Sequence, residues 1–238
     1  MLACVKSDIG LVRQLNEDSY IFVPPNLFAV ADGMGGHAAG EIASNLATKV
    51  VKEYVSQHVG SADTVQVLEQ AISMANKVVY QTAKNISECA GMGTTVTVVY
   101  IDGNMAYWGH VGDSRLYLLR DASIIQLTND HSLVWELMQS GTITREEAAS
   151  HPQRNILTRA VGSSEQVKIE TGSIQTLPGD ILLLCTDGLT NMVSEDEICN
   201  VIYSMPDIGE AVDKLISLAN EAGGYDNITA VIIKYGVS

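Results

Sequence analysis

The sequence predicts a layered α+β sandwich, in which pairs of helices pack on mostly antiparallel β-sheets. Two observations support this fold class: several strands are separated by very short links, and the amphipathic helices occur in pairs. Short links favour hairpins, because a parallel connection needs about a dozen residues or more. The 238 residues are 46% hydrophobic and 18% charged, which is typical of a globular protein. No linker-like stretch occurs, so we expect one domain over residues 1–238.

The N-terminal part of the chain is predicted to contain three short strands followed by two long helices. The strands are expected at Leu2–Val5, Ser19–Val23 and Leu27–Ala31. From Glu41 to Val59, apolar residues recur every three or four positions, which is the pattern of one helix face. The same spacing from Val65 to Ala83 predicts a second helix.

Four more strands are expected in the middle of the chain, at Thr94–Ile101, Met105–Val111, Arg115–Arg120 and Ile124–Leu127. The links between them contain Asp102-Gly103, Gly112-Asp113 and Asp121-Ala122, and each link is expected to close a hairpin. Residues 132–162 break this rhythm with short helical pieces and several charges. We interpret them as an irregular surface excursion, and long excursions of this kind are commonly functional.

The C-terminal part is predicted to alternate strand, two helices and strand. The strands are Ile181–Cys185 and Ile228–Lys234. The first helix is expected to begin at Ser194, because Ser194-x-x-Glu197 has the form of a capping box. The second is expected from Ile208 to Ala222.

The formal charge of −14 argues against two classes of partner. Nucleic acid and anionic membrane both bind proteins through neutralised phosphates, so an acidic surface repels them. The four cysteines form no C-x-x-C pair, and the N-terminus lacks the apolar core of a signal peptide. No apolar run approaches the about 18 residues of a membrane helix. We therefore expect a cytoplasmic protein.

Aspartates stand at the ends of the most apolar strands. Asp32 follows Leu27–Ala31, Asp187 follows the strand at Ile181, and Asp226 directly precedes the last strand. In antiparallel sheets, the end of one strand lies beside the start of its neighbour. The three aspartates are therefore expected to converge on one edge.

Converging carboxylates repel one another unless a cation lies between them. Mg²⁺ and Mn²⁺ prefer such oxygen ligands and keep several waters. Asp18 and Asp113 also flank strands, and Gly33, which lacks a Cβ, would let its backbone approach a metal closely. The alternative is that Asp-Gly is only a common turn dipeptide. The histidines are isolated and form no zinc motif; they are His37, His58, His110, His131 and His151.

The stretch Gly33–Ala38 also fits the loose dinucleotide pattern G-x-G-x-x-G/A, so an oxidoreductase is a rival hypothesis. Asp32 would place a negative charge near the pyrophosphate. The acidic residue expected at the end of a second strand, about 20 residues on, is missing because the helix still runs through Glu53. These features argue against nucleotide binding.

Six motifs of the sequence resemble, in order, those of the PPM (type 2C) family of protein phosphatases, in its compact bacterial branch. They are Arg13–Asp18, Val30–His37, Gly93–Thr95, Gly109–Arg115, Thr186–Leu189 and Asp226–Thr229. The resemblance covers essentially the whole chain. It implies a four-layer α-β-β-α sandwich, with two mostly antiparallel sheets flanked by pairs of helices and a metal cleft at one edge.

The resemblance also implies roles for individual residues. Asp32 is similar to the carboxylate that bridges two metals, and the Gly33 carbonyl resembles a ligand of one of them. Asp187 and Asp226 resemble terminal ligands. Glu17 and Asp18 resemble supports or direct ligands of the metal pair.

Two further positions are implied at the edges of this site. Asp113 is similar to a ligand of a third, weaker metal, and Arg13 resembles the phosphate-binding arginine. Animal members carry a histidine directly after the Asp-Gly pair, where this chain has Met34, and His37 is not equivalent to it. The general acid is therefore left unassigned.

The function implied is that of a metal-dependent serine/threonine protein phosphatase. It would hydrolyse phosphoserine and phosphothreonine by in-line attack of a water activated by two tightly bound Mn²⁺ or Mg²⁺ ions. The expected partners are phosphorylated proteins, including a serine/threonine kinase and its substrates, and a monomer is expected. Residues 132–162 would form a flap beside the cleft. A catalytically weak phosphoprotein-binding module of the same fold is the alternative, and loss of metal ligands would be its signature.

Overall fold

The computed structural model describes residues 1–35, 39–60 and 63–236. Its strands are β1 (Leu2–Asp8), β2 (Asp18–Val23), β3 (Leu27–Met34), β4 (Gly93–Thr94), β5 (Val96–Asp102), β6 (Met105–Val111), β7 (Arg115–Arg120), β8 (Ser123–Gln126), β9 (Glu170–Gln175), β10 (Ile181–Cys185) and β11 (Ile228–Lys234). Its helices are α1 (Ala39–His58), α2 (Thr64–Asn85), the short 3₁₀ helix η1 (Ser87–Cys89), α3 (Leu133–Gln139), α4 (Arg145–Ala149), α5 (Asp187–Thr190), α6 (Glu195–Ser204) and α7 (Ile208–Glu221).

The strands form two antiparallel sheets. One has the order β1-β11-β10-β7-β8, and the other has the order β2-β3-β5-β6-β9, with β4 paired to β3. Every strand pair in the described part of the chain is antiparallel. A dinucleotide-binding fold needs parallel strands joined by helices, so the oxidoreductase alternative is wrong.

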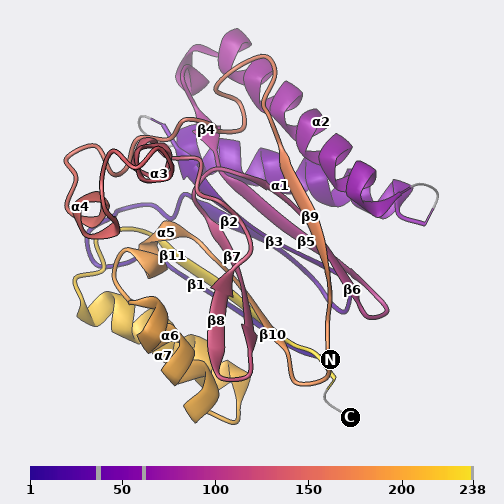
Figure 1. Cartoon of the computed structure of the whole chain (residues 1–238). Coiled ribbons are helices and arrows are strands. Elements are labelled where there is room, and N and C mark those ends of the chain that lie inside the picture. Colours follow the sequence, from indigo (N-terminus) through magenta and orange to yellow (C-terminus); the bar gives the residue numbers. More distant parts are fainter. Residues whose placement is uncertain (36–38, 61–62, 237–238) are drawn as a thin grey trace.

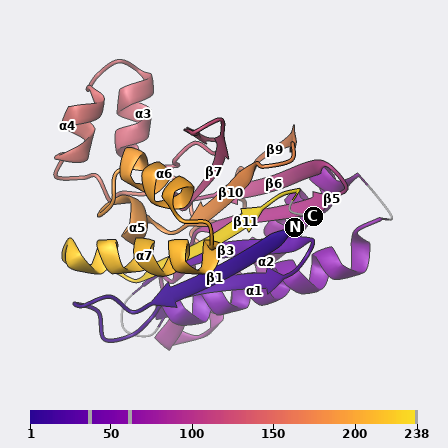
Figure 2. The same ribbon diagram turned by 90° about the horizontal axis from the view of Figure 1, so that it is seen from below.

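The two sheets stack face to face, and a helix pair covers the outer face of each (Figures 1 and 2). One apolar cluster joins α1 and α2 to the sheet of β3 and β5. A second joins α6 and α7 to the sheet of β10 and β11, and a third fills the space between the sheets. Burial of apolar side chains in these three clusters drives the layering. The predicted four-layer α-β-β-α sandwich is confirmed.

Two of the three expected hairpins are confirmed, and one is wrong. β5 pairs with β6 across Asp102-Gly103, and β7 pairs with β8 across Asp121-Ala122. The Gly112-Asp113 link instead carries the chain from β6 in one sheet to β7 in the other. The reason is that β6 already has β5 on one edge and β9 on the other, so no edge remains for β7. We call residues Gly112–Ser114 the crossover.

Strand β9, which pairs along β6, was not predicted from the sequence. Its residues, Glu170–Gln175, are polar and half-buried or exposed, so they carry no strong apolar signal. Residues 132–162 hold α3 and α4 and project beyond the sandwich, as Figures 1 and 2 show. Within the described ranges, no helix is both long and apolar enough to span a membrane.

Helix α6 begins where its capping motif predicts. The Ser194 hydroxyl accepts a hydrogen bond from the backbone N–H of Glu197 at 3.3 Å, which satisfies one of the free N–H groups of the first turn. This cap fixes the start of α6 shortly after α5, which carries Asp187.

Candidate metal centre

Asp18 and Asp32 come together because β2 and β3 are antiparallel neighbours. The two residues are direct partners in the register of these strands. Strand β3 runs on to Met34, so Asp32 lies within the strand rather than after it. Its backbone is fixed from the other side by Thr95, whose hydroxyl accepts a hydrogen bond from the Asp32 N–H at 2.8 Å and whose own N–H donates to the Asp32 carbonyl at 2.9 Å.

Asp187 and Asp226 belong to the other sheet. Asp187 is the first residue of α5, directly after β10, and Asp226 precedes β11. Because Cys185 pairs with Ala230, the end of β10 lies beside the start of β11. The side-chain amide of Asn191 donates to Asp187 Oδ2 at 3.0 Å, which fixes this carboxylate from within the same turn.

The carboxylates of both sheets meet at one end of the sandwich. Removal from water raises the pKa of Asp32 well above its ordinary value, and the charges of Asp18, Asp187, Asp113 and Asp226 raise it further. Burial followed by repulsion from Asp226 also raises the pKa of Asp187. Charges that act on one another in this way lie near one another, and the strand register places Asp18 opposite Asp32 and the end of β10 beside the start of β11. The structure therefore brings all five aspartates together across the two sheets.

Asp18 is the most deeply buried of these aspartates. Burial raises its pKa to about 7, although the hydroxyls of Thr229 and Thr186 donate to its Oδ2 at 2.7 and 2.8 Å. Its Oδ1 has no hydrogen-bond partner, and neither have Asp187 Oδ1 and Glu17 Oε1. Buried oxygens without a donor are costly, and a cation would satisfy them.

The donor set fits a hydrated divalent cation. Within residues 1–35, 39–60 and 63–236, no three His, Cys, Asp or Glu side chains form a group that could hold a metal ion by themselves. Mg²⁺ and Mn²⁺ bound through carboxylates retain several waters, so a complete protein shell is not needed. The unpartnered carboxylate oxygens described above are the feature of this structure that favours such an ion.

Gly33 lies beside the start of α1. A Cβ at this position would collide with the backbone of Gly40 and with the Glu17 carbonyl, which accepts a hydrogen bond from the Gly33 N–H at 3.1 Å. Close packing between three backbone segments thus requires glycine here. Glycine at position 33 therefore has a packing reason, in addition to the expected close approach of its backbone to a metal.

Arg13 lies at the solvent side of the cluster. Its Nη2 is 2.8 Å from Asp226 Oδ2, and the Arg13 side chain is 46% exposed. The Arg13 guanidinium is therefore accessible to solvent while it contacts Asp226, a candidate metal ligand.

Asn227 is a residue whose role was not predicted. Its Oδ1 accepts from the Glu17 N–H at 2.8 Å, and its Nδ2 donates to the carbonyls of Ile9 and Leu15, both at 2.9 Å. It thereby fastens the loop that carries Arg13 and Glu17 to the start of β11. The signal in the sequence was its position directly after Asp226 in a motif.

Two histidines that are far apart in the sequence come together in the fold. His110 and His131 are both buried, and their ring centroids are 4.7 Å apart. His37 lies outside the described residues. Met34 is half-buried at the end of β3.

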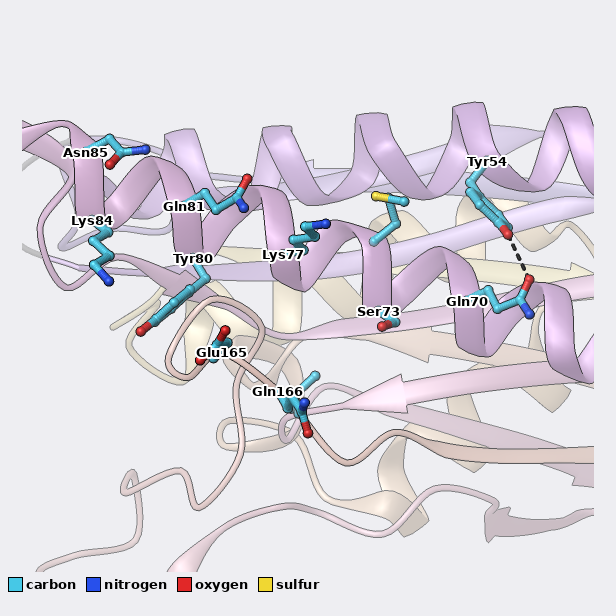
Figure 3. Close-up of a pocket in the computed structure, with 12 residues that line it drawn as sticks. Tyr54, Gln70, Ser73, Lys77, Tyr80, Gln81, Lys84, Asn85, Glu165 and Gln166 are labelled. Atoms are coloured by element: carbon cyan, nitrogen blue, oxygen red, sulfur yellow. Dashed lines mark hydrogen bonds between the residues drawn. The ribbon is translucent and has the colours of Figure 1, made fainter.

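A cavity of about 1060 Å³ opens beside the carboxylates. Asp113 and Asp187 line this cavity together with residues of α3, α4 and α6. A second hollow of about 840 Å³ runs along α2 and is walled by residues 165–167 (Figure 3). None of the candidate ligands lines that second hollow, so the chemistry belongs to the first.

The chain is similar to known proteins over almost its whole length. The family model described as Protein phosphatase 2C matches residues 13–227. The serine/threonine phosphatase Stp of Listeria monocytogenes is 38% identical over 241 residues, which are 98% of this chain and 96% of Stp.

The serine/threonine protein phosphatase PstP of Mycobacterium tuberculosis is 40% identical over 227 residues, which are 95% of this chain but 43% of PstP. A crystal structure of PstP matches with a TM-score of 0.91 and 39% identity, over 97% of each chain. The catalytic domain of PstP in complex with two manganese ions matches with a TM-score of 0.87 and 37% identity, over 97% of this chain and 96% of that one.

Proposed function

The chain belongs to the protein phosphatase 2C family, and we propose that it is a metal-dependent serine/threonine protein phosphatase. The observation that carries this proposal is the convergence of five aspartates from two sheets beside an exposed arginine. The aspartates supply oxygen ligands, and the arginine supplies a fork of donors that fits a phosphate.

We propose that Asp32, Asp187, Asp226 and the Gly33 carbonyl hold two Mn²⁺ or Mg²⁺ ions, with Asp32 between them. Asp32 suits this role because the charges of the other four aspartates all act on it. When bound, such a pair of ions supplies a water of lowered pKa and positive charge for the entering and leaving oxygens. The aspartates whose pKa is raised must lose their protons when the ions bind.

Three residues are assigned supporting roles. Asp18 and Glu17 each have a buried oxygen without a hydrogen-bond partner, which supports their assignment as direct or water-mediated ligands. Asp113 is assigned to a third, weaker metal. Burial, followed by the charges of Asp187 and Asp130, raises the pKa of Asp113, so a further cation would relieve the same repulsion.

Arg13 binds and orients the phosphate of the substrate. Its ion pair with Asp226 is half-exposed, so the pair costs little to rearrange when an incoming dianion competes for the guanidinium. Holding the phosphate in line with the attacking water lowers the barrier by orientation.

We propose phosphorylated proteins as substrates, among them a serine/threonine kinase and its targets, because the relatives are named serine/threonine phosphatases. A monomer of one domain, working in the cytoplasm, is part of the same proposal. The four free cysteines support a reducing compartment. The binding-module alternative gains no support, since none of the expected carboxylates is missing from the sequence.

The test is phosphate release from a phosphothreonine peptide with Mn²⁺ and after exhaustive chelation. Asp32→Ala and Asp226→Ala should each lower kcat by about 10²-fold or more, because each removes charge that acts on the reacting centre. Glu53→Gln, an exposed change on α1, is the matched control and should be neutral. Normal turnover by chelated wild type or by Asp32→Ala would show that the proposed function is wrong.

A further inference from the structure

The crossover Gly112–Ser114 delivers Asp113 to the candidate metal centre. It spans the two sheets in three residues, so its conformation decides where the Asp113 carboxylate lies. Gly112 has φ of 114°, and a Cβ there would collide with Thr95. Ser114 is held by hydroxyls, since its Oγ is 2.7 Å from Thr95 Oγ1 and its carbonyl accepts from Thr97 Oγ1 at 3.0 Å.

His131 holds the other end of the crossover with two hydrogen bonds. Its backbone N–H donates to the Gly112 carbonyl at 2.7 Å, and its ring Nδ1 accepts from the Gly112 N–H at 3.1 Å. The backbone N–H and the carbonyl of Gly112 are therefore both hydrogen-bonded to His131, which is buried. This is a more specific contact than core packing requires.

The hydrogen bonds also fix the ring of His131. Because Nδ1 accepts from a backbone N–H, the proton of the neutral ring is on Nε2. This Nε2 lies 3.5 Å from Glu170 Oε2 on β9 but makes no hydrogen bond within the described residues. Glu170 is held in turn by the N–H and the side-chain amide of Asn129, each donating at 3.2 Å. A carboxylate this close to the ring favours the tautomer that carries its proton on Nε2.

His110 packs beside the ring of His131. It is fully buried, its ring plane is tilted by 35° from that of His131, and it contacts Thr97 Oγ1 at 2.9 Å and the Asn129 carbonyl at 3.1 Å. Burial, and then the neighbouring His131, lowers the pKa of His110 to about 4, so this ring stays neutral at pH 7. The His131 ring therefore lies against both His110 and Glu170.

His131 also marks the base of the segment 132–162. Its carbonyl accepts from the Thr158 N–H at 2.8 Å, and Leu133 N–H donates to the Ile156 carbonyl at 2.8 Å. The two ends of that segment are thus hydrogen-bonded to each other at His131, which also binds Gly112.

We propose that His131 is a positioning residue, which places Asp113 in the metal centre through its two hydrogen bonds with Gly112 and is itself oriented by Glu170. This inference rests on the proposed function for the assignment of Asp113. A purely structural role for His131 predicts lower stability without any specific link to Asp113.

The first test observes the hydrogen bond directly, without metal or substrate. Hydrogen exchange of the Gly112 amide is followed by NMR in the chelated protein. His131→Phe keeps a ring but loses the acceptor, and should speed this exchange by about tenfold, the effect of one lost hydrogen bond. His131→Asn offers an oxygen near the position of Nδ1 and should restore most of the protection. Ile72→Val, a core change in α2, is the control for general destabilisation.

The second test measures the link to Asp113. His131→Phe should need about tenfold more Mn²⁺ for half-maximal activity, and calorimetry should show the same loss for the weak site, whereas Ile72→Val should not shift it. In a double-mutant cycle, adding His131→Phe to Asp113→Ala should change turnover less than twofold further, because both act on the same ligand. If His131→Phe fails to fold, Glu170→Gln tests the same series of contacts. It should shift the Mn²⁺ requirement in the same direction.

Two results would overturn the proposal: unchanged exchange at Gly112 in His131→Phe, or effects that multiply fully in the double mutant. Loss of the proposed function is distinguishable from both. If wild type released no phosphate, the exchange and the Mn²⁺ calorimetry would still decide whether His131 places Asp113.

Discussion

A substitution at Arg13 should distinguish substrate binding from the chemical step. It contacts Asp226 from the solvent side, and an exposed pair of this kind contributes at most about 1 kcal/mol to stability. Arg13→Ala should therefore leave the fold intact and raise KM for a small phosphoester by about tenfold, with a smaller effect on kcat.

Arg13→Lys is the matched control, because it keeps the charge but loses the planar fork. Steady-state kinetics with p-nitrophenyl phosphate should place this variant between wild type and Arg13→Ala. An unchanged KM in both variants would remove Arg13 from the phosphate site.

At the residue scale, the sequence predicts the candidate ligands better than the residues that hold them. Asp32, Asp187 and Asp226 could be found because each adjoins an apolar strand, which is a local signal. The donors that hold Asp18 could not, since Thr186 and Thr229 are 168 and 211 residues away along the chain. Such contacts depend on the packing of both sheets rather than on any local pattern.

At the scale of elements, helix α4 forms one wall of the cavity beside the metal centre. A capping box of Thr144 and Glu147 starts the helix. Arg145 then reaches α6, with its Nη2 2.7 Å from Glu195 Oε2. Glu195 also faces Arg115 at 3.8 Å, so the segment 132–162 is connected to the sheet that carries Asp187. We propose that this segment is a flap that contacts the protein part of a substrate.

Trimming Thr142–Ser150 should change kcat/KM on phosphopeptides by about tenfold or more, but on p-nitrophenyl phosphate by less than about twofold. The physical reason is that α4 lines the cavity through Arg145 and Ala148, whereas Arg13, the proposed phosphate ligand, is not among the residues that line it. Arg145→Ala is the control that breaks the ion pair without shortening the chain. Equal changes on both substrates would instead make the segment a tolerated surface loop.

The two elements that the sequence predicted wrongly have different causes. Strand β9 is polar and half-buried or exposed, so it has no strong apolar signal, whereas the path of the crossover depends on which strand edges are free. Edge occupancy is a property of the assembled sheet, whereas periodicity reports only the burial of a strand's own faces. Strands buried on both faces, such as β3, β10 and β11, were accordingly placed within a few residues.

At the scale of the whole molecule, the layers could be predicted because each has its own periodicity. Apolar positions on α1, α2, α6 and α7 all point to a sheet, and the sheets share a third apolar cluster. The acidity of the chain has a meaning at this scale as well. Part of the formal charge of −14 is concentrated where the two sheets meet, in side chains that repel one another.

This concentration of charge makes the stability of the chelated protein depend on pH. Burial raises the pKa of Asp18 from an ordinary value of 3.8 to about 7, and the pKa values of Asp32, Asp113 and Asp187 are also raised. A raised pKa means that the folded state binds protons which the unfolded state has released. The stabilisation from these groups is therefore fully present below the pKa that aspartates have in the unfolded chain. It is lost as pH rises from about 4 through 7.

Divalent metal should reverse this dependence, because cations bind the ionised carboxylates and displace the protons. We expect Tm of the chelated protein to fall between pH 5 and pH 7.5, and we expect Mn²⁺ to raise Tm more at pH 7.5 than at pH 5. Scanning calorimetry measures both trends, and titration of Mn²⁺ in buffers of different ionisation enthalpy should reveal proton release near pH 6. Asp18→Asn is the matched control: it removes one buried charge and should flatten the fall in Tm of the chelated protein. An equal Mn²⁺ effect at both pH values, with no protons released, would mean that the metal does not bind at these carboxylates.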